Sequence, residues 1–335
     1  QNRNIEENVY DTSYTYDIFG NINRTHHKGD VNNADDDKYE YFEYLNNSNK
    51  WIVNKIKNYT LTNTTNNRIR NTRYIYDNQN FGQAPINGSL TAKQDWLDNG
   101  NAPTTNYTYN SFGNIINETD ANGHRTDYFY GIRDTTNTFV DRIMNNKSQI
   151  TDYNYEPGIG KLLWQIDSNG MGTNYSYDVF GRIIKEVKIY DNQNFPTKNY
   201  SYEYDGVAPE EVKISYRETN NTTNTYDEYS FYDGFGNIIQ TKKEAENSQQ
   251  IVSNTFYNEL FEIKNQSNPY FVSFSDNYTA PNMAIDSTKF LYDVLGRNIE
   301  VINPDGSRKN TTYFHWNVTF YDENGNRKEQ SMDAY

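Results

Sequence analysis

The sequence predicts an all-β fold, and three observations support this prediction. The 335 residues include 32 Tyr and 31 Thr but only 9 Leu and 10 Ala. Aromatic and β-branched side chains favour strands, and the straight-chain residues that favour helices are scarce. A Tyr-x-Tyr-Asp segment followed by glycine recurs along the chain, and sequences of the Asp-x-Asn-Gly type lie between its copies. Both are typical of strands joined by tight turns.

The repeated segment is a nine-residue motif, written Tyr-x-Tyr-Asp-x-x-Gly-Asn-Ile in its first copy. Five copies span residues 14–22, 107–115, 175–183, 230–238 and 290–298, and partial copies begin at Tyr74, Tyr153, Tyr202 and Phe320. Because side chains alternate between the two faces of a strand, the aromatic residues of a copy face one side and the residue between them faces the other. Each predicted strand therefore has one aromatic and one polar face.

The Asp or Asn of each motif begins a predicted turn, because its side chain accepts hydrogen bonds from backbone N–H groups. The glycine three residues later occupies a position where φ is positive. The predicted turn residues are Asp17 and Gly20, Asn110 and Gly113, Asp178 and Gly181, Asp233 and Gly236, and Asp293 and Gly296. Phe261 replaces this glycine after Asn258, which leaves the geometry of that turn open. A second set of turns is predicted at 120–123, 167–170, 303–306 and 322–325.

At these residues the sequence resembles the YD-repeat, or Rhs-repeat, family, which is named for the Tyr-Asp pair followed by Gly-Arg. It is most similar to the repeats that follow SpvB-like and TcdB-like toxin segments, on the strength of residues 233–242, Tyr270, 292–297, 303–306 and 319–327. The resemblance implies tandem antiparallel hairpins stacked into a spiralling sheet or hollow shell. In toxin complexes and Rhs effectors such a shell encloses a toxic domain, and in teneurins it forms a cell-surface barrel.

The repeat organisation predicts one continuous repeat region over residues 1–335. Residues 332–335 resemble the start of another motif, so we expect the chain to be a fragment of a longer protein. Two stretches, residues 31–67 and 78–101, lack the motif. We expect them to form either longer strands or loops that decorate the repeats.

Composition and motifs argue against several classes of function. The net charge of -14 disfavours nucleic acid as a partner, since phosphate binding needs clustered Lys and Arg. The chain has no Cys, no Gly-x-Ser-x-Gly motif and no apolar run long enough to span a membrane as a helix. We therefore predict a protein that is not an enzyme, with no catalytic residues, no cofactor and no metal site.

The residues most typical of metal or sugar binding have simpler interpretations. His26, His27, His124 and His315 lack zinc-site spacing, so we expect them to pack on strands or face solvent. The run from Asp35 to Asp37 lacks the closing Glu of a calcium loop, which favours a solvated acidic turn. Tryptophan side chains stack on sugars in some proteins, but we expect Trp51, Trp96, Trp164 and Trp316 to be buried strand anchors.

Asparagine is unusually frequent, and it creates many sequons of the Asn-x-Ser/Thr type. Random placement of the 52 Asn predicts about 8 sequons, whereas the chain has 16. They begin at Asn23, Asn46, Asn58, Asn63, Asn87, Asn106, Asn117, Asn146, Asn174, Asn199, Asn220, Asn221, Asn265, Asn277, Asn310 and Asn317. Those at Asn58, Asn106, Asn174, Asn199 and Asn277 have the alternative interpretation of by-products of the strand motif. For loop positions we expect Asn46, Asn63, Asn87, Asn146, Asn220 or Asn221, and Asn265.

Two functional hypotheses follow. The first is a wall segment of a hollow β-shell that encloses and delivers a toxin or other cargo. The second is a glycosylated building block of an extracellular fibre, tube or adhesin. Both predict an extracellular or cell-surface location. The expected partners are the rest of a longer chain, identical subunits, an enclosed toxin or a cell-surface ligand, and neither hypothesis includes nucleic acid or a membrane span.

Overall fold

A computed structural model describes residues 10–30, 34–314 and 317–331. These residues form 26 strands and two short 3-10 helices, η1 (Ala34–Asp36) and η2 (Ser48–Lys50), so the all-β prediction is confirmed. The chain divides into two compact units, which comprise residues 1–157 and 158–331. His315, Trp316 and residues 332–335 lie outside the described part of the chain.

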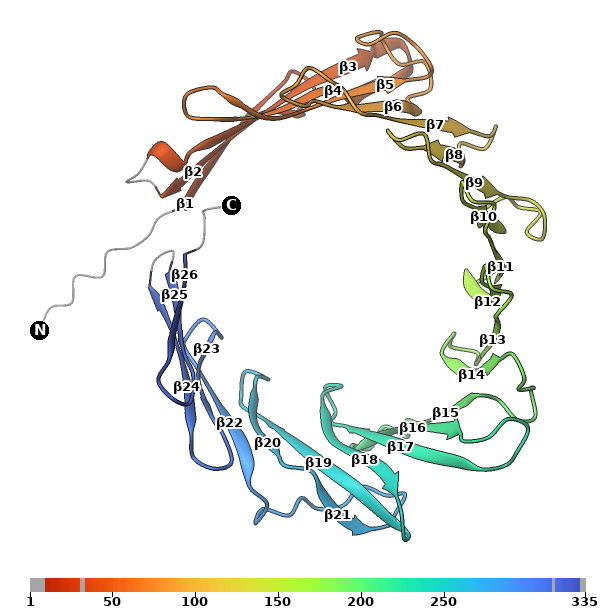
Figure 1. Cartoon of the computed structure of the whole chain (residues 1–335), viewed down its shortest axis with the longest axis vertical. Coiled ribbons are helices and arrows are strands. Elements are labelled where there is room, and N and C mark those ends of the chain that lie inside the picture. Colours follow the sequence, from red (N-terminus) through yellow and green to blue (C-terminus); the bar gives the residue numbers. More distant parts are fainter. Residues whose placement is uncertain (1–9, 31–33, 315–316, 332–335) are drawn as a thin grey trace, which may run out of the picture. The chain divides into compact units, whose positions relative to one another are not determined.

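The first unit contains 11 strands, which pair with their sequence neighbours in antiparallel order (Figure 1). Their bounds are β1 (Tyr10–Tyr16), β2 (Ile22–Asp30), β3 (Lys38–Asn47), β4 (Ile52–Asn63), β5 (Arg68–Tyr76), β6 (Leu90–Asp95), β7 (Thr104–Tyr109), β8 (Ile115–Thr119), β9 (Arg125–Phe129), β10 (Arg142–Met144) and β11 (Ile150–Glu156).

The second unit continues the same pattern with 15 strands. Their bounds are β12 (Lys161–Ile166), β13 (Gly172–Tyr177), β14 (Ile183–Lys188), β15 (Lys198–Glu203), β16 (Glu210–Arg217), β17 (Thr225–Tyr232), β18 (Ile238–Ala245), β19 (Gln249–Tyr257), β20 (Ile263–Ser267), β21 (Tyr270–Ser273), β22 (Ser287–Tyr292), β23 (Asn298–Ile302), β24 (Arg308–Phe314), β25 (Asn317–Tyr321) and β26 (Arg327–Ser331). Its meander is interrupted once, where β19 pairs with both β20 and β21 and β20 then pairs with β22.

The structure shows what forms in the two stretches that lack the motif, residues 31–67 and 78–101. Residues 38–47 and 52–63 form the long strands β3 and β4, which pair with each other. Residues 78–89 form a loop inside the turn between β5 and β6. Asp77 organises this loop, because its carboxylate accepts hydrogen bonds from the backbone N–H groups of residues 86–89 at 2.7–3.1 Å. The loop is therefore an insertion in an ordinary repeat turn.

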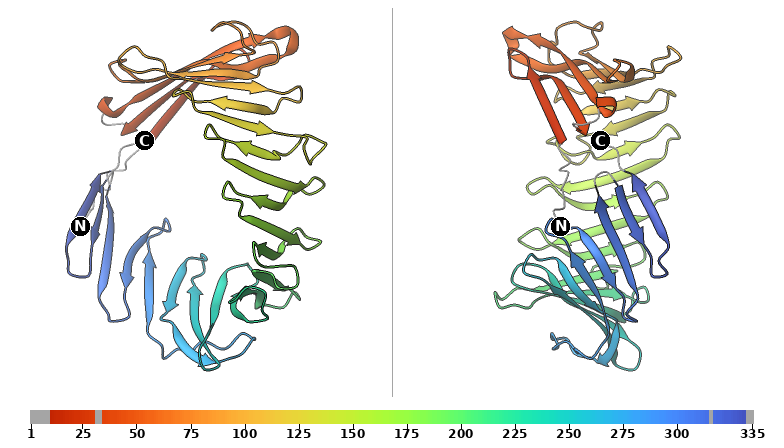
Figure 2. Two further views of the ribbon diagram at one scale, coloured as in Figure 1. Left: turned by 45° about the vertical axis from the view of Figure 1, so that its right-hand side comes forward. Right: turned by 90° about the vertical axis from the view of Figure 1, so that its left-hand side faces the viewer.

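In a meander, alternate connections lie at the same edge of the sheet, and Figure 2 shows the two rows of loops at opposite ends of the strands. The motif turns between β1 and β2, β7 and β8, β13 and β14, β17 and β18, β19 and β20, and β22 and β23 all share one edge within their unit, which we call the repeat edge. The Asp-x-Asn-Gly turns at 120–123, 167–170, 303–306 and 322–325 share the other edge, which we call the opposite edge.

Most hairpins are joined to the preceding one by a tyrosine hydroxyl. Eight tyrosines donate a hydrogen bond of 2.7–3.1 Å to a backbone carbonyl of the hairpin before them. The donor and acceptor pairs are Tyr44 and Ile22, Tyr76 and Ile56, Tyr109 and Leu90, Tyr177 and Leu162, Tyr202 and Ile183, Tyr257 and Ile238, Tyr292 and Ile263, and Tyr313 and Asn298.

A β-bulge explains why these carbonyls are available. In the β13–β14 hairpin, Tyr177 pairs with Ile183 but Ser176 pairs with Lys185, so one residue of β14 is extra. A bulge of this kind removes ladder bonds locally. Seven of the eight acceptors are the first residue of such a shift in register. The next tyrosine therefore satisfies a carbonyl that the bulge has freed.

The best-packed region lies beneath residues 274–286, which connect β21 to β22. Within it, Tyr229, Phe231 and Val252 are almost completely buried, together with Gln240 and Lys242. Strand pairing places Phe231 opposite Gln240 and Tyr229 opposite Lys242, all on the face opposite the tyrosine bonds. Elsewhere much of both faces stays partly exposed, and only ten apolar side chains are buried among the described residues, two of them prolines.

The first prediction tests the tyrosine bonds. Tyr177→Phe removes one hydroxyl and leaves the Leu162 carbonyl without its 2.7 Å donor, so we expect the free energy of unfolding to fall by about 1 kcal/mol. Urea denaturation followed by circular dichroism measures this loss. Tyr16→Phe is the matched control, because Tyr16 lies in the first described strand and is 58% exposed. Equal losses in both variants would show that the bond does not join the hairpins.

Candidate functional site

The repeat turn is the most regular site in the chain. In the turn between β17 and β18, the Asp233 carboxylate accepts hydrogen bonds from the N–H groups of Phe235 and Asn237, both at 2.9 Å. The Gly236 N–H donates to the Asp233 carbonyl at 3.1 Å, and the Asp233 N–H donates to the Asn237 carbonyl at 2.9 Å. This is a three-residue loop closed by a left-handed residue.

All five motif glycines have the positive φ that the turn requires. The φ angles are 87° at Gly20, 87° at Gly113, 76° at Gly181, 86° at Gly236 and 77° at Gly296. The substituted turn has the same geometry, because Phe261 has φ of 61° and its N–H donates to the Asn258 carbonyl at 3.1 Å. The Phe261 ring lies 4.8 Å from the ring of Phe235, centroid to centroid. The replacement of glycine therefore did not change the turn.

The turn carboxylates are held in their charged form. In the turn between β22 and β23, the side chain of Arg297 donates from Nε to Asp293 at 2.7 Å and is the main reason that the pKa of Asp293 is lowered. Backbone N–H groups of Leu295 and Arg297 contribute in the same direction. In the turn between β13 and β14, Arg182 makes the equivalent 2.7 Å bond to Asp178.

The pKa values of the joining tyrosines shift in the opposite direction to those of the turn acids, because burial dominates at the tyrosines whereas hydrogen bonds dominate at the acids. Desolvation raises the pKa of Tyr44, Tyr109, Tyr177 and Tyr292, and it raises the pKa of Tyr76 to about 12. These hydroxyls stay protonated, which is the state that donates to the bulge carbonyl.

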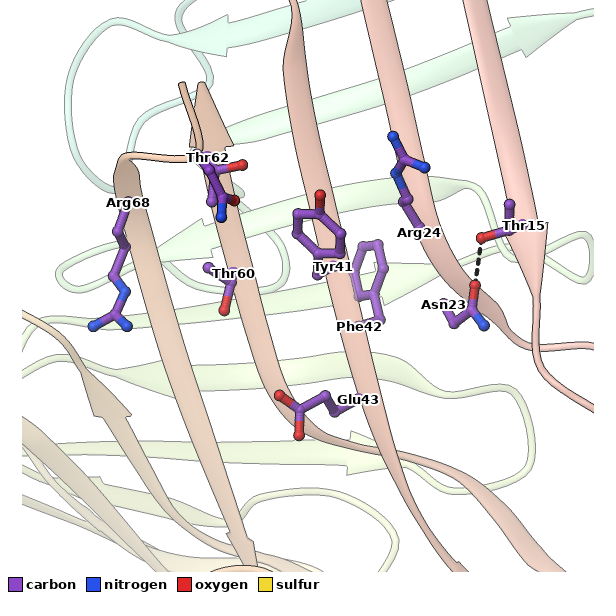
Figure 3. A pocket seen from close by; sticks show the side chains of 10 residues that line it. Thr15, Asn23, Arg24, Tyr41, Phe42, Glu43, Thr60, Thr62 and Arg68 are labelled. Atoms are coloured by element: carbon purple, nitrogen blue, oxygen red, sulfur yellow. Dashed lines mark hydrogen bonds between the residues drawn. The ribbon is translucent and has the colours of Figure 1, made fainter. Parts of the chain in front are cut away.

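A hollow of about 670 Å³ lies on the polar face of β1 to β5, within the first unit (Figure 3). Arg24, Tyr41 and Glu43 line it, together with Thr15, Asn23, Phe42, Thr60, Thr62, Asn66 and Arg68. The guanidinium carbon of Arg24 lies 5.9 Å from the Tyr41 ring centroid, and Thr15 donates to Asn23 at 2.5 Å. Glu43 is paired with Lys57 at 2.7 Å. The hollow is therefore polar, open and lined by both signs of charge.

A second polar cluster lies beneath residues 274–286 and was not anticipated from the sequence. Lys242 donates to the backbone carbonyls of Ser275 and Asn277, and Tyr229 donates to Asp276 at 2.9 Å. Burial lowers the pKa of Lys242, while Glu211 and Asp276 oppose that change. Because its nitrogen is covered and bound to carbonyls, Lys242 holds the connection on the sheet. No spacing signal in the sequence links residue 242 to residues 275–277.

The histidines and the acidic run take structural roles. His26 lies in β2, 2.7 Å from the Asp37 carboxylate and stacked on Tyr39, and His27 lies 3.0 Å from Glu40. His124 lies 3.1 Å from Asp120 in a turn of the opposite edge. Asp37 is buried against His26, so the expectation of a wholly solvated acidic turn was wrong for this residue. Among the described residues, no group of three or more His, Asp or Glu is arranged to hold a metal ion.

The expectation that the tryptophans are buried strand anchors was wrong for Trp51, and Trp96 and Trp164 are only half-buried. Trp51 follows η2 and is 74% exposed, because it adopts positive φ at the end of a short turn. Trp96 lies just after β6 and is half-buried, with Arg68 stacked 5.0 Å from its ring centroid. Trp164 lies in β12 and is also half-buried. Trp316 is outside the described residues.

The structure separates the sequons by exposure. Ten sequon asparagines are exposed, namely Asn46, Asn87, Asn106, Asn146, Asn174, Asn199, Asn220, Asn221, Asn277 and Asn310. Six are half-buried, namely Asn23, Asn58, Asn63, Asn117, Asn265 and Asn317. The expected loop position of Asn265 was wrong, because Asn265 lies in β20 between Phe256 and Lys289 of the neighbouring strands. Asn46 and Asn63 likewise lie at the ends of strands.

Comparisons with solved structures relate the fold to a toxin complex. The chain is similar to TcdB2-TccC3, with a TM-score of 0.72 at 11% identity over 95% of this chain and 24% of that chain. It is similar to TcdB2-TccC3-Cdc42, with a TM-score of 0.71 at 11% identity over 95% of this chain and 26% of that chain. It therefore spans about a quarter of the length of these structures.

The sequence itself gives no further match. No protein-family profile and no curated protein matches it. The described part of the chain also contains no helix that is long and apolar enough to cross a membrane. The structural likeness confirms the resemblance made on the motifs, and the chain has the YD-repeat, or Rhs-repeat, fold.

The second prediction concerns the turn glycine. Gly236→Ala places a side chain at φ of 86° with no atom within 4 Å of the new methyl group, so the cost is conformational alone. We expect it to lower the free energy of unfolding by about 1 kcal/mol. Gly234→Ala in the same turn is the control, because Gly234 also has open space around it and lacks positive φ. Urea denaturation of both variants distinguishes conformational strain from a general effect of mutating the turn.

The third prediction concerns alkaline pH. Because the pKa of Tyr76 is about 12 in the folded chain and about 10 when unfolded, its protonated form stabilises the fold below pH 10. We expect this contribution to be lost as the pH rises from about 10 to about 12. Urea midpoints measured across this range, with tyrosinate absorbance, follow the loss. Tyr76→Phe should show a smaller decline than the unmodified chain, and an equal decline would contradict the assignment to Tyr76.

Proposed function

We propose that this chain is a non-catalytic wall segment of a hollow β-shell. The observation that carries the proposal is the likeness of 95% of the chain to TcdB2-TccC3 at a TM-score of 0.72. The proposal extends to secretion and to enclosure of a toxin or other cargo within a longer protein. Its partners are then other parts of that protein and the enclosed cargo.

The packing supports a wall. Ordinary domains bury one face of a sheet against a second layer. In this chain most of the described sheet has no second layer. The main exception is β17 to β19, which residues 274–286 cover. A sheet with two largely uncovered faces suits a partition between two compartments.

The tyrosine bonds suit the same role. A single-layer sheet has little core to hold it together, so the bonds between consecutive hairpins resist local opening. The wall is then continuous from one hairpin to the next, with no need for a large apolar core.

The fourth prediction tests containment in the longer protein purified with its own flanking sequence. Triple replacement with Tyr177→Phe, Tyr202→Phe and Tyr257→Phe removes three bonds between hairpins of the second unit. We expect the enclosed segment, protected from protease in the unmodified protein, to be cleaved at least tenfold faster in the triple variant. The control is Tyr16→Phe. Equal cleavage of the unmodified protein and the triple variant would contradict containment.

A second function has a specific observation in its favour. Ten exposed sequons on one chain suit a glycosylated building block of an extracellular fibre, tube or adhesin. Asn106, Asn174 and Asn199 lie in strands and face away from the tyrosine beside them, while Asn87, Asn146 and Asn220 lie in loops.

The fifth prediction separates the two functions by glycopeptide analysis of protein from its own source. In an open fibre, the exposed strand and loop sequons should both carry sugar. In a shell whose polar face is enclosed, Asn106, Asn174 and Asn199 should be bare, because an enclosed lumen has little room for glycans. If no sequon of either class is modified, the glycosylated alternative is wrong.

A further inference from the structure

We propose that the repeat edge of the second unit is an interaction surface that associates with the repeat edge of a second copy of this chain. The feature that points to it is the residue type at the turn tips. Apart from Gly234 and Glu259, the central positions of the motif turns in this unit expose large apolar side chains, with Val179 94% and Val294 98% exposed. Phe180, Phe235, Leu260 and Leu295 are exposed in the same way.

Turn geometry does not require apolar tips. The Asp or Asn at the start of the turn and the left-handed residue near its end make the hydrogen bonds, and the central side chains make none. The turns of the opposite edge show this directly. They use the same bonds from Asp167 and Asp322 but carry Ser168 and Asn169, or Glu323 and Asn324, at their tips. Large apolar tips are thus typical of the motif turns for a reason other than folding of the turn, although the longer connection between β14 and β15 on the opposite edge also exposes Tyr190.

The tips form a regular row. Successive connections on one edge are two strands apart, which is roughly 10 Å in a sheet. Tyr204 and Val207 continue the row between β15 and β16. With Phe261, the row has nine exposed side chains. At on the order of 100 Å² each they offer roughly 900 Å² of surface, which is close to the area that one partner contributes to a stable interface. A second copy of this chain has a row of tips with the same spacing. Its tips can therefore contact these tips along the whole row.

Charge also permits this contact. The chain carries a net charge of -14, which opposes self-association. At the two turns with the most exposed tips, however, the carboxylates are neutralised by their own arginines, Asp178 by Arg182 and Asp293 by Arg297. Contact between these two turns and a second copy therefore brings no unpaired turn carboxylate into the interface.

The test is sedimentation equilibrium of the whole chain at low and high salt. We expect a reversible dimer that strengthens with salt, because salt screens the net charge while leaving the apolar contact in place. The variant Val179→Ser, Phe180→Ser, Val294→Ser, Leu295→Ser should weaken dimerisation at least tenfold. Val179→Ser with Phe180→Ser should weaken it by a smaller factor.

The matched control changes four tips of the opposite edge, with Ala121→Ser, Asn122→Ser, Ser168→Ala and Asn169→Ser, and should dimerise like the unmodified chain. Circular dichroism establishes that each variant keeps its strands. The proposal is wrong if the unmodified chain stays monomeric up to about 100 μM, or if the fourfold serine variant dimerises unchanged. It is also wrong if the unmodified chain binds neutral lipid vesicles through these tips and does not self-associate.

Discussion

The hydrogen bond from a tyrosine hydroxyl to a bulge carbonyl is the contact on which the repeat architecture depends. Tyr76 shows that a joining tyrosine takes part in two hairpins. Its backbone pairs with Leu90 in its own hairpin, and its hydroxyl donates to the Ile56 carbonyl of the hairpin before. Leu90 in turn accepts from Tyr109. The hairpin of β5 and β6 thus provides an acceptor to the next hairpin and takes one from the hairpin before. A single-layer sheet with few buried apolar groups needs such contacts, because burial alone stabilises it weakly.

The tight turn creates the bulge that supplies the acceptor of the tyrosine bond. The Asp233 carboxylate fixes the turn, and the turn sets the register that opposes Tyr232 to Ile238 and leaves an extra residue before Gln240. The first residue of that bulge receives the hydroxyl of Tyr257. A change in the turn therefore affects the contact with the next hairpin as well as its own. The aspartate at the start of the turn is kept even where the loop is enlarged, as at Asp77, although Asn80 stands three residues later in place of glycine.

The sequence predicts the turns and the aromatic face because those features depend on neighbouring residues. It does not predict the cover over β17 to β19, because that cover joins Lys242 to Asn277 and Tyr229 to Asp276, which are far apart in sequence. The same limit applies to Asn265, whose strand is defined by pairing with Lys289. Trp51 was misassigned because its side chain suits burial, whereas its backbone takes positive φ at the end of η2.

The direction of the tyrosine bonds has a consequence for how the sheet is assembled. In all eight pairs the hydroxyl belongs to the later residue and the carbonyl to the earlier one. A chain emerging from the ribosome therefore always offers a finished acceptor to the hairpin that is being made. Growth can proceed from the N-terminal end by adding one hairpin at a time, with each step closing only a short loop. The exception is the hairpin of β17 and β18, whose cover by residues 274–286 forms only after that later part of the chain has been made.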